Sequence, residues 1–277
     1  MAKVHILLYD KNDEGGNALK NKMGLQRILK TNSQYQASPD KVIINWGNSQ
    51  MLPHCKGSQF INHPNAIATS VNKIKAFQAM EGKCRHVPYT THQAIAMAWL
   101  TQGHKVVCRD TVTGCKGAGL RVVAPTGSNF VPDEQCGFWA TLSAWITNPS
   151  VASNSAVLGN SPLYTKFTPF VKEYRVHVVG DKAVNVRRKV TSVDDPTVVG
   201  DFKNVTIYNQ DIVDQAVKAT KAVGLDFAGV DVLWDGQLAW VLETNTAPAI
   251  GGTLTVQGYA EGLRKLIKDK YGISLTF

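Results

Sequence analysis

Short apolar runs alternate with amphipathic stretches along the chain, a pattern that predicts a protein mixing strands and helices. In the first part, the apolar runs Val4–Tyr9 and Val42–Trp46 flank a helix-like stretch, Ala18–Lys30. Strands that alternate with helices are typical of parallel sheets. We therefore expect a small α/β lobe with parallel strands up to about residue 70.

The same pattern assigns most of the remaining chain. Helices are predicted at Ser70–Met80 (capped by Thr69 or Ser70), at Gln93–Thr101, from Asp211 to a stop at Gly224, and at Gln257–Lys270. Strands are predicted at Lys105–Arg109, Leu120–Ala124, Leu163–Phe167, Tyr174–Val179 and Ala183–Lys189. Segment 125–161, rich in Pro, Asn, Ser and Gly, allows no assignment. The expected class is α/β or α+β.

Composition bears on the compartment of the protein and on the kind of partner it binds. The 277 residues contain no apolar run near the roughly 18 residues that a membrane span needs. The five cysteines form no CxxC pair and the histidines no HxxxH motif, which argues against zinc and favours reduced thiols in the cytoplasm. A net charge of +9 favours anionic partners, namely nucleotides, nucleic acid or acidic substrates.

A predicted hairpin near the C-terminus carries a candidate metal site. Strands Val230–Trp234 and Leu238–Leu242 flank an Asp-Gly turn, with Asp231 on the first strand and Glu243 and Asn245 ending the second. Two carboxylates and an amide oxygen suit a hard cation such as Mg²⁺. A two-residue turn would place Asp231 and Glu243 on opposite faces, so the site requires an odd-length loop or a β-bulge. Solvated acids at the end of a hairpin are the alternative.

Two further segments have the residue types that bind anions. The loop Thr111–Gly119 is glycine-rich between two strands, so its backbone N–H groups could contact phosphates, although a mobile hairpin is the plainer alternative. In EYRVHVVGDKAVNVRRK, strand alternation places Glu173, Arg175 and His177 on one face, and Arg187 with Lys189 on one face of the returning strand. Arginine suits phosphate or carboxylate recognition, whereas His177 alone favours a structural role.

The order of these segments resembles the ATP-grasp superfamily of carboxylate–amine ligases, especially the glutamate-ligase-type branch and its phage-encoded relatives. The resemblance covers about residues 62–250 and rests on VNKIKAFQAM, VVCRDTVTGCKGAGLRVV, LYTKFTPFVKEYRVHVVGDKAVNVRRK, GDFKN, GLDFAGVDVL and VLETNTAP. It implies an N-terminal α/β pre-ATP-grasp lobe (1–70), a small lobe with the glycine-rich loop (71–163) and a C-terminal lobe with the metal site (164–277). ATP would lie between the last two lobes.

The resemblance also implies roles for matching residues. ATP would be bound by Lys73, Arg109, Gly114, Lys116, Gly117, Gly119, Lys166 and Phe167, with Glu173 serving the ribose or the acceptor. Arg109 stands where the family usually has a lysine, which is a departure from its pattern. Arg175 and Lys189, with Arg187, would hold the acyl phosphate or the acceptor carboxylate. Asp231, Glu243 and Asn245 match the Mg²⁺ ligands, and Mn²⁺ is an alternative ion.

The implied reaction activates a carboxylate with the γ-phosphate of ATP and joins it to an amine, releasing ADP. Three alternatives stay open: a kinase that phosphorylates a hydroxyl, a ligase that acts on modified nucleic acid, and a basic nucleic-acid-binding module without enzymatic activity. Dimers are common in the family, so a homodimer is an expectation. The sequence identifies neither the acid nor the amine.

Overall fold

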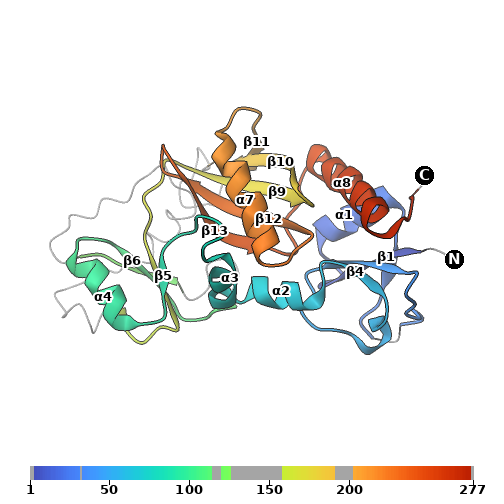
Figure 1. The fold of residues 1–277 in the computed structure, drawn as a ribbon, viewed down its shortest axis with the longest axis horizontal. Coiled ribbons are helices and arrows are strands. Elements are labelled where there is room, and N and C mark those ends of the chain that lie inside the picture. The colour runs from blue at the N-terminus through green and yellow to red at the C-terminus, as the bar shows by residue number, and fades with distance from the viewer. Residues whose placement is uncertain (1–2, 32, 114–119, 126–157, 191–201, 276–277) are drawn as a thin grey trace.

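The computed structural model describes residues 3–31, 33–113, 120–125, 158–190 and 202–275. Figure 1 shows an elongated arrangement in which a central sheet separates a lobe containing the N-terminal strands from a smaller lobe containing α4. Three separate sheets account for the strands: two of four strands and one of five. In the described part of the chain, no helix is long and apolar enough to cross a membrane.

The N-terminal sheet is entirely parallel, as predicted. Its strands are β1 (Val4–Leu8), β2 (Gln26–Ile28), β3 (Val42–Trp46) and β4 (Gln59–Ile61). Their order is β2-β1-β3-β4, with every neighbouring pair parallel. β1 and β3 are buried along their whole length, which explains why they appear in the sequence as continuous apolar runs. A single 3₁₀ turn, η1 (Pro53–Cys55), precedes β4.

The first helix differs from the predicted Ala18–Lys30. Helix α1 covers Glu14–Met23, and Asp13 caps its start by accepting a hydrogen bond from the Gly16 N–H at 2.6 Å. Gly24, at φ +64°, ends the helix in the left-handed conformation that glycine adopts without strain. Residues 26–28 are therefore free to form the edge strand β2, and the predicted extension to Lys30 is wrong.

The helix predicted at Ser70–Met80 is in fact two helices. Helix α2 covers Pro64–Val71 and helix α3 covers Lys73–Met80. Asn72 separates them, because its backbone is extended and its side chain accepts a hydrogen bond from the Lys75 N–H at 3.1 Å. This N-cap places Lys73 at the first position of α3.

The small lobe is built on an antiparallel sheet. Its strands are β5 (Tyr89–Thr90), β6 (Val106–Arg109), β7 (Leu120–Val123) and β8 (Leu163–Lys166), in the order β5-β8-β6-β7. Helix α4 (Gln93–Thr101) has the predicted bounds and buries Ala96 and Leu100 against this sheet. Arg109, at the end of β6, is a buried charged residue.

The central sheet is antiparallel and has the order β11-β10-β9-β12-β13. Its strands are β9 (Lys172–Val179), β10 (Lys182–Lys189), β11 (Phe202–Asn204), β12 (Phe227–Trp234) and β13 (Ala239–Asn245). Helices α7 (Gln210–Ala222) and α3 share one apolar core with this sheet. Figure 1 shows α7 lying across one face of it.

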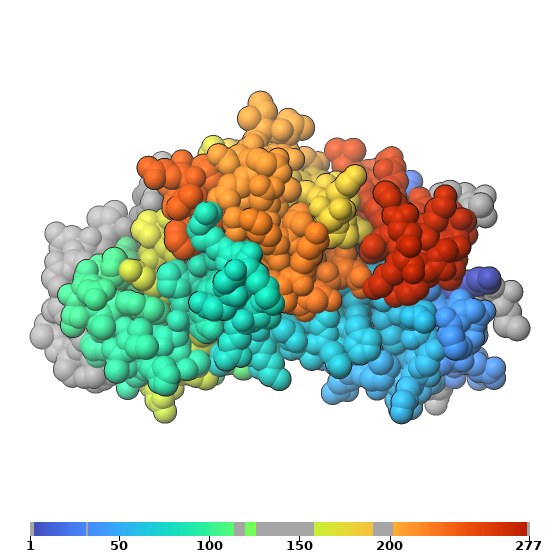
Figure 2. Space-filling view, in the orientation of Figure 1, coloured from blue at the N-terminus to red at the C-terminus, as the bar shows by residue number. Residues whose placement is uncertain are grey.

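Helix α8 (Thr253–Tyr271) joins the central sheet to the N-terminal lobe. It packs against β9 and β10 and also against α1, and Figure 2 shows its atoms lying directly on those of the N-terminal lobe. Tyr259 and Ile267 share a buried cluster with Ile6 and Trp46. The division into lobes at residues 70 and 163 stays a prediction, although the first and last segments share a core.

Candidate functional site

A β-bulge at the end of the central sheet brings the two predicted carboxylates together. Asp231 is paired with Glu243, but the next pair is Val232 with Val241, so Leu242 is the extra residue. The connecting turn spans residues 235–238 rather than two residues, and Trp234 pairs with Ala239 across it. A regular ladder from that pair would place Leu242 opposite Asp231. The bulge that the sequence required is confirmed, and it aligns Asp231 with Glu243.

Asn245 completes the polar edge of this hairpin. Its amide donates a hydrogen bond to Asp231 Oδ2 at 3.2 Å. Glu243 and Asn245 are half-buried on one face of β13, whereas Thr244 between them is buried on the other. Ser70 of α2 fixes that second face through contacts with the Thr244 carbonyl at 2.9 Å and hydroxyl at 2.6 Å. The oxygen-bearing side chains therefore project from a well-anchored strand.

Lys73 forms an ion pair with Glu243. Its Nζ lies 2.6 Å from Glu243 Oε2, and the start of α3 determines this approach. The backbone N–H of Lys73 also donates to the Val112 carbonyl at 2.9 Å, which ties α3 to the segment that follows β6. The position predicted for phosphate contact thus lies beside the position predicted for metal binding.

Arg175 forms an ion pair with Asp231. Its Nε and Nη2 donate to Asp231 Oδ1 and Oδ2 at 2.7 and 2.8 Å, a bidentate geometry that fixes both groups. The two residues are direct neighbours across β9 and β12. Arg109 adds a third cation: it is 5% exposed, and its Nε has no hydrogen-bond partner. An unpartnered buried guanidinium N–H is costly, so an anion beside it would be favoured.

The pKa shifts show how strongly these charges interact. Burial on its own would raise the pKa of Glu243, but Lys73, Arg109 and Arg175 together lower it to about 2. Burial lowers the pKa of Arg109, and Glu243 partly opposes this. Three cations thus face two carboxylates, and the excess of positive charge suits a ligand carrying several negative charges.

Glu173 and Lys189 form a second, more deeply buried pair. The Lys189 Nζ lies 3.1 Å from Glu173 Oε2, and their side chains are 5% and 7% exposed, respectively. Burial raises the pKa of Glu173 to about 7, although Lys189 acts in the opposite direction. The pair lies on the faces of β9 and β10 that strand alternation predicted for these residues.

Phe202 is a site residue that the sequence pattern did not single out. The guanidinium groups of Arg175 and Arg187 lie 4.6 and 5.7 Å from its ring centroid, and Arg187 also donates a hydrogen bond to its carbonyl. The sequence analysis included Phe202 only as part of the GDFKN motif. His177 is fully buried beside the Tyr259 hydroxyl at 3.2 Å, and burial lowers its pKa to about 3. The sequence favoured a structural role for this histidine, since it stands alone.

Other predicted residues lie away from this cluster or outside the described chain. Gly114, Lys116, Gly117 and Gly119 lie outside the described residues. Lys166 ends β8 on the small sheet, and Phe167 follows it, with Lys105 Nζ 5.4 Å from its ring centroid. Among the predicted residues that the structure describes, Lys73, Arg109, Arg175 and the three predicted metal ligands form one cluster. The Glu173–Lys189 pair adjoins it, since Glu173 interacts with the charges of Arg175 and Asp231.

The side-chain oxygens of Asp231, Glu243 and Asn245 suit a hard cation such as Mg²⁺. Within the described ranges, no group of three or more His, Cys, Asp or Glu residues is placed to hold a metal ion. The candidate set is smaller: the carboxylates of Asp231 and Glu243, aligned by the bulge, and the amide oxygen of Asn245. An ion with so few protein ligands needs further oxygens from water or phosphate, as Mg²⁺ commonly has.

Several solved structures share this architecture. One is the ATP-grasp ligase PsnB complexed with a minimal precursor, with a TM-score of 0.65 and 14% identity over 94% of this chain and 97% of that chain. Another is D-alanyl-alanine synthetase A from Vibrio cholerae, with a TM-score of 0.61 and 10% identity over 98% and 99% of the two chains. A third is a RimK domain ATP-grasp protein from Sphaerobacter thermophilus, with a TM-score of 0.59 and 14% identity over 94% and 99%.

Sequence comparison adds nothing to this result, because no protein-family model and no curated protein sequence matches the chain. The structural matches nevertheless extend over nearly the full length of both partners. The fold expected from the sequence is confirmed: this chain has the ATP-grasp fold.

Proposed function

We propose that the protein is an ATP- and Mg²⁺-dependent carboxylate–amine ligase that releases ADP. One observation carries the proposal: Lys73, Arg109 and Arg175 converge on the aligned carboxylates of Asp231 and Glu243. Such a cluster combines cations for phosphate groups with oxygen ligands for a metal ion. The ATP-grasp ligase PsnB, which has the same fold, supports this assignment, since it is described with Mg and ADP and with AMPPNP.

In this proposal, Lys73 and Arg109 bind the phosphates of ATP. Asp231, Glu243 and Asn245 hold Mg²⁺, or Mn²⁺ in its place, and the bound ion offsets the negative charge of the phosphates. Arg175 keeps Asp231 in position through its bidentate contact. Lys73 contacts Oε2 of Glu243, at 2.6 Å, so the other carboxylate oxygen stays available to the metal ion.

The reaction then proceeds in two displacements. A carboxylate oxygen of the acid attacks the γ-phosphorus, the bond to ADP breaks, and an acyl phosphate forms. The amine nitrogen attacks the acyl carbon, loses a proton and releases inorganic phosphate. Arg187 and Lys189 are proposed to orient the acyl phosphate or the acceptor carboxylate. The glycine-rich loop at residues 114–119, with Lys116, and β8, with Lys166 and Phe167, are proposed to cover ATP and exclude water.

The substrates are proposed at the level of class. PsnB is described with a precursor peptide, and D-alanyl-alanine synthetase is named for a dipeptide product. We therefore propose a small acid or peptide carboxylate and an amine acceptor of similar size. The net charge of +9 keeps a nucleic-acid acceptor as the second candidate. A cytoplasmic location, a homodimer and kinship with phage enzymes belong to the same proposal.

The decisive experiment measures ADP and phosphate release against a panel of acids and amines. Glu243→Gln removes one metal ligand and should reduce turnover by about 10²- to 10³-fold, as the loss of a preorganised charge contact in a catalytic site typically does. Glu261→Gln is the matched control, because Glu261 lies on the exposed face of α8 and contacts Gln257. Glu243→Gln also breaks the ion pair with Lys73, so turnover is compared at a temperature at which thermal melting shows both variants to be folded.

The products separate the alternatives. A ligase releases ADP and phosphate and forms an amide, whereas a kinase releases ADP and leaves a stable phosphorylated product. Turnover that depends on DNA or RNA would favour the nucleic-acid ligase. Salt-sensitive DNA binding without any binding of Mg-ATP would refute the proposal and support the basic binding module.

A further inference from the structure

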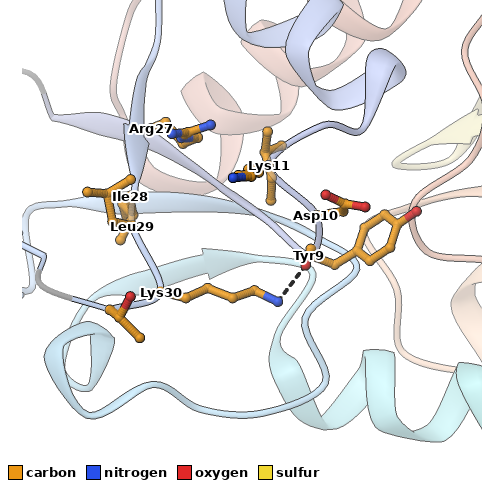
Figure 3. Close-up of a pocket in the computed structure, with 9 residues that line it drawn as sticks. Tyr9, Asp10, Lys11, Arg27, Ile28, Leu29 and Lys30 are labelled. Atoms are coloured by element: carbon orange, nitrogen blue, oxygen red, sulfur yellow. Dashed lines mark hydrogen bonds between the residues drawn. The ribbon is translucent and has the colours of Figure 1, made fainter.

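The N-terminal lobe has a cavity of its own, away from the ion-pair cluster. It has a volume of about 440 Å³ and opens at the carboxyl ends of the neighbouring parallel strands β1 and β2. Figure 3 shows it bounded by the segments that follow these two strands. The cavity lies beside β1, which borders the switch point of this sheet between β1 and β3, and its volume lies in the range of small-molecule sites.

The lining of this cavity carries an excess of positive charge. Lys11, Arg27 and Lys30 line it together with one acidic residue, Asp10. The Lys30 Nζ donates to the Tyr9 carbonyl at 2.5 Å, which links the two strand ends across the opening. The Asp10 carboxylate accepts a hydrogen bond from the Asn12 N–H at 2.9 Å. It therefore lies toward the turn after β1, with a partner of its own.

The other two cations are available to a ligand. Among the described residues, neither the Lys11 ammonium nor the Arg27 guanidinium makes a hydrogen bond or an ion pair. Figure 3 shows both groups on the same side of the cavity. Two cations that converge without a carboxylate partner repel one another, and an anion between them would relieve this repulsion.

Apolar surface also borders the opening. Leu29 is 44% exposed and lines the cavity beside Ile28, whereas the ring of Tyr9 points to the other side in Figure 3. Large apolar side chains that border a charged cavity favour a ligand with a less polar part. A simple inorganic ion would leave this surface in contact with water.

We propose that this cavity binds a small organic anion, a carboxylate or a phosphate monoester that carries an apolar or aromatic group. The anionic oxygens lie between Lys11 and Arg27, and the apolar part covers Leu29. The site is separate from the cluster of Lys73, Arg109 and Arg175. It requires neither ATP nor ligase activity, so it goes beyond the proposed function.

Calorimetric titration at low salt tests the site with phenyl phosphate, phenylacetate and inorganic phosphate as probes. The wild type should bind at least one aromatic anion with a Kd of about a millimolar, and the tighter of the two identifies the preferred oxyanion. The double variant Lys11→Gln/Arg27→Gln should weaken this binding at least tenfold. Leu29→Ser should weaken the aromatic probe while leaving the affinity for inorganic phosphate unchanged.

One control separates this cavity from other basic regions. Lys22→Gln changes an exposed lysine of α1 that lines a different cavity, beside α8, and should leave binding unchanged. Equal binding in the double variant would overturn the proposal, as would no heat from either aromatic anion at about 10 mM. None of these results depends on whether the enzyme turns over ATP.

Discussion

Asn62 is the residue whose replacement most directly tests how the N-terminal lobe is fixed to the catalytic sheet. It lies just after β4 and is fully buried, with a left-handed backbone at φ +61°. Its side-chain Nδ2 donates to the Phe227 carbonyl at 2.9 Å, and its Oδ1 accepts from the Asp226 and Phe227 N–H groups at 2.7 and 3.0 Å. Phe227 begins β12, the strand that carries Asp231.

The expected cost of Asn62→Ala follows from these contacts. Three hydrogen bonds to buried backbone groups are lost at about 1 kcal/mol each, and alanine in the left-handed region adds about 1 kcal/mol of strain. The free energy of unfolding should therefore fall by about 3–5 kcal/mol, measured by urea denaturation. Tryptophan fluorescence is a suitable signal, because Trp46 stacks on Phe227 with ring centroids 5.2 Å apart.

Asn62→Gly is the matched control for the Asn62→Ala measurement. Glycine removes the same hydrogen bonds but adopts the left-handed conformation freely, so it should be more stable than the alanine variant by about 1 kcal/mol. If Asn62→Ala lowered the free energy of unfolding by less than about 1 kcal/mol, the reasoning would be refuted, because the hydrogen bonds would then contribute almost nothing. Equal destabilisation by both variants would show that the backbone conformation is not strained.

Three further predictions concern the central sheet and the thiols. Gly229→Ala should destabilise the protein by about 1–3 kcal/mol in urea, since a β-carbon there would lie 2.6 Å from Pro248. Asp211→Asn should lower the free energy of unfolding by about 1 kcal/mol relative to the wild type at pH 7. Hydrogen bonds from Ala239, Gln215 and Arg85 outweigh burial and lower the Asp211 pKa, so this difference should vanish as pH falls through that lowered value. Burial raises the pKa of Cys84 to about 11, so iodoacetamide at pH 7.5 should leave it unmodified in peptide mass spectra.

Local sequence patterns predicted the parts of the site that depend on strand geometry. Alternation placed Glu243 and Asn245 on one face. The even spacing from Asp231 required an odd-length loop or a bulge, and the structure contains the bulge. The same reasoning put Arg187 and Lys189 on one face of the returning strand, but the contact of Lys189 with Glu173 was not predicted. These predictions needed only a period of two and the position of one turn.

The sequence did not reveal contacts between distant segments. The Lys73–Glu243 ion pair joins residues separated by 170 positions, and Asn62 contacts Phe227 across 165. No periodicity specifies which helix start meets which strand end. The helix ends at Gly24 and Asn72 were not predicted either. Apolar spacing continues through both positions, but capping ends the helices there.

The shared core of the first and last segments has a consequence for how the chain folds during synthesis. Leu19 and Trp46 pack with Phe227, Tyr259 and Ile267, which a ribosome releases much later. Until then, one face of the parallel sheet lacks its covering helix and exposes apolar side chains. Contacts of such large sequence separation slow folding, because a long loop must close before they form. We expect the nascent N-terminal lobe to depend on chaperones until α8 has emerged.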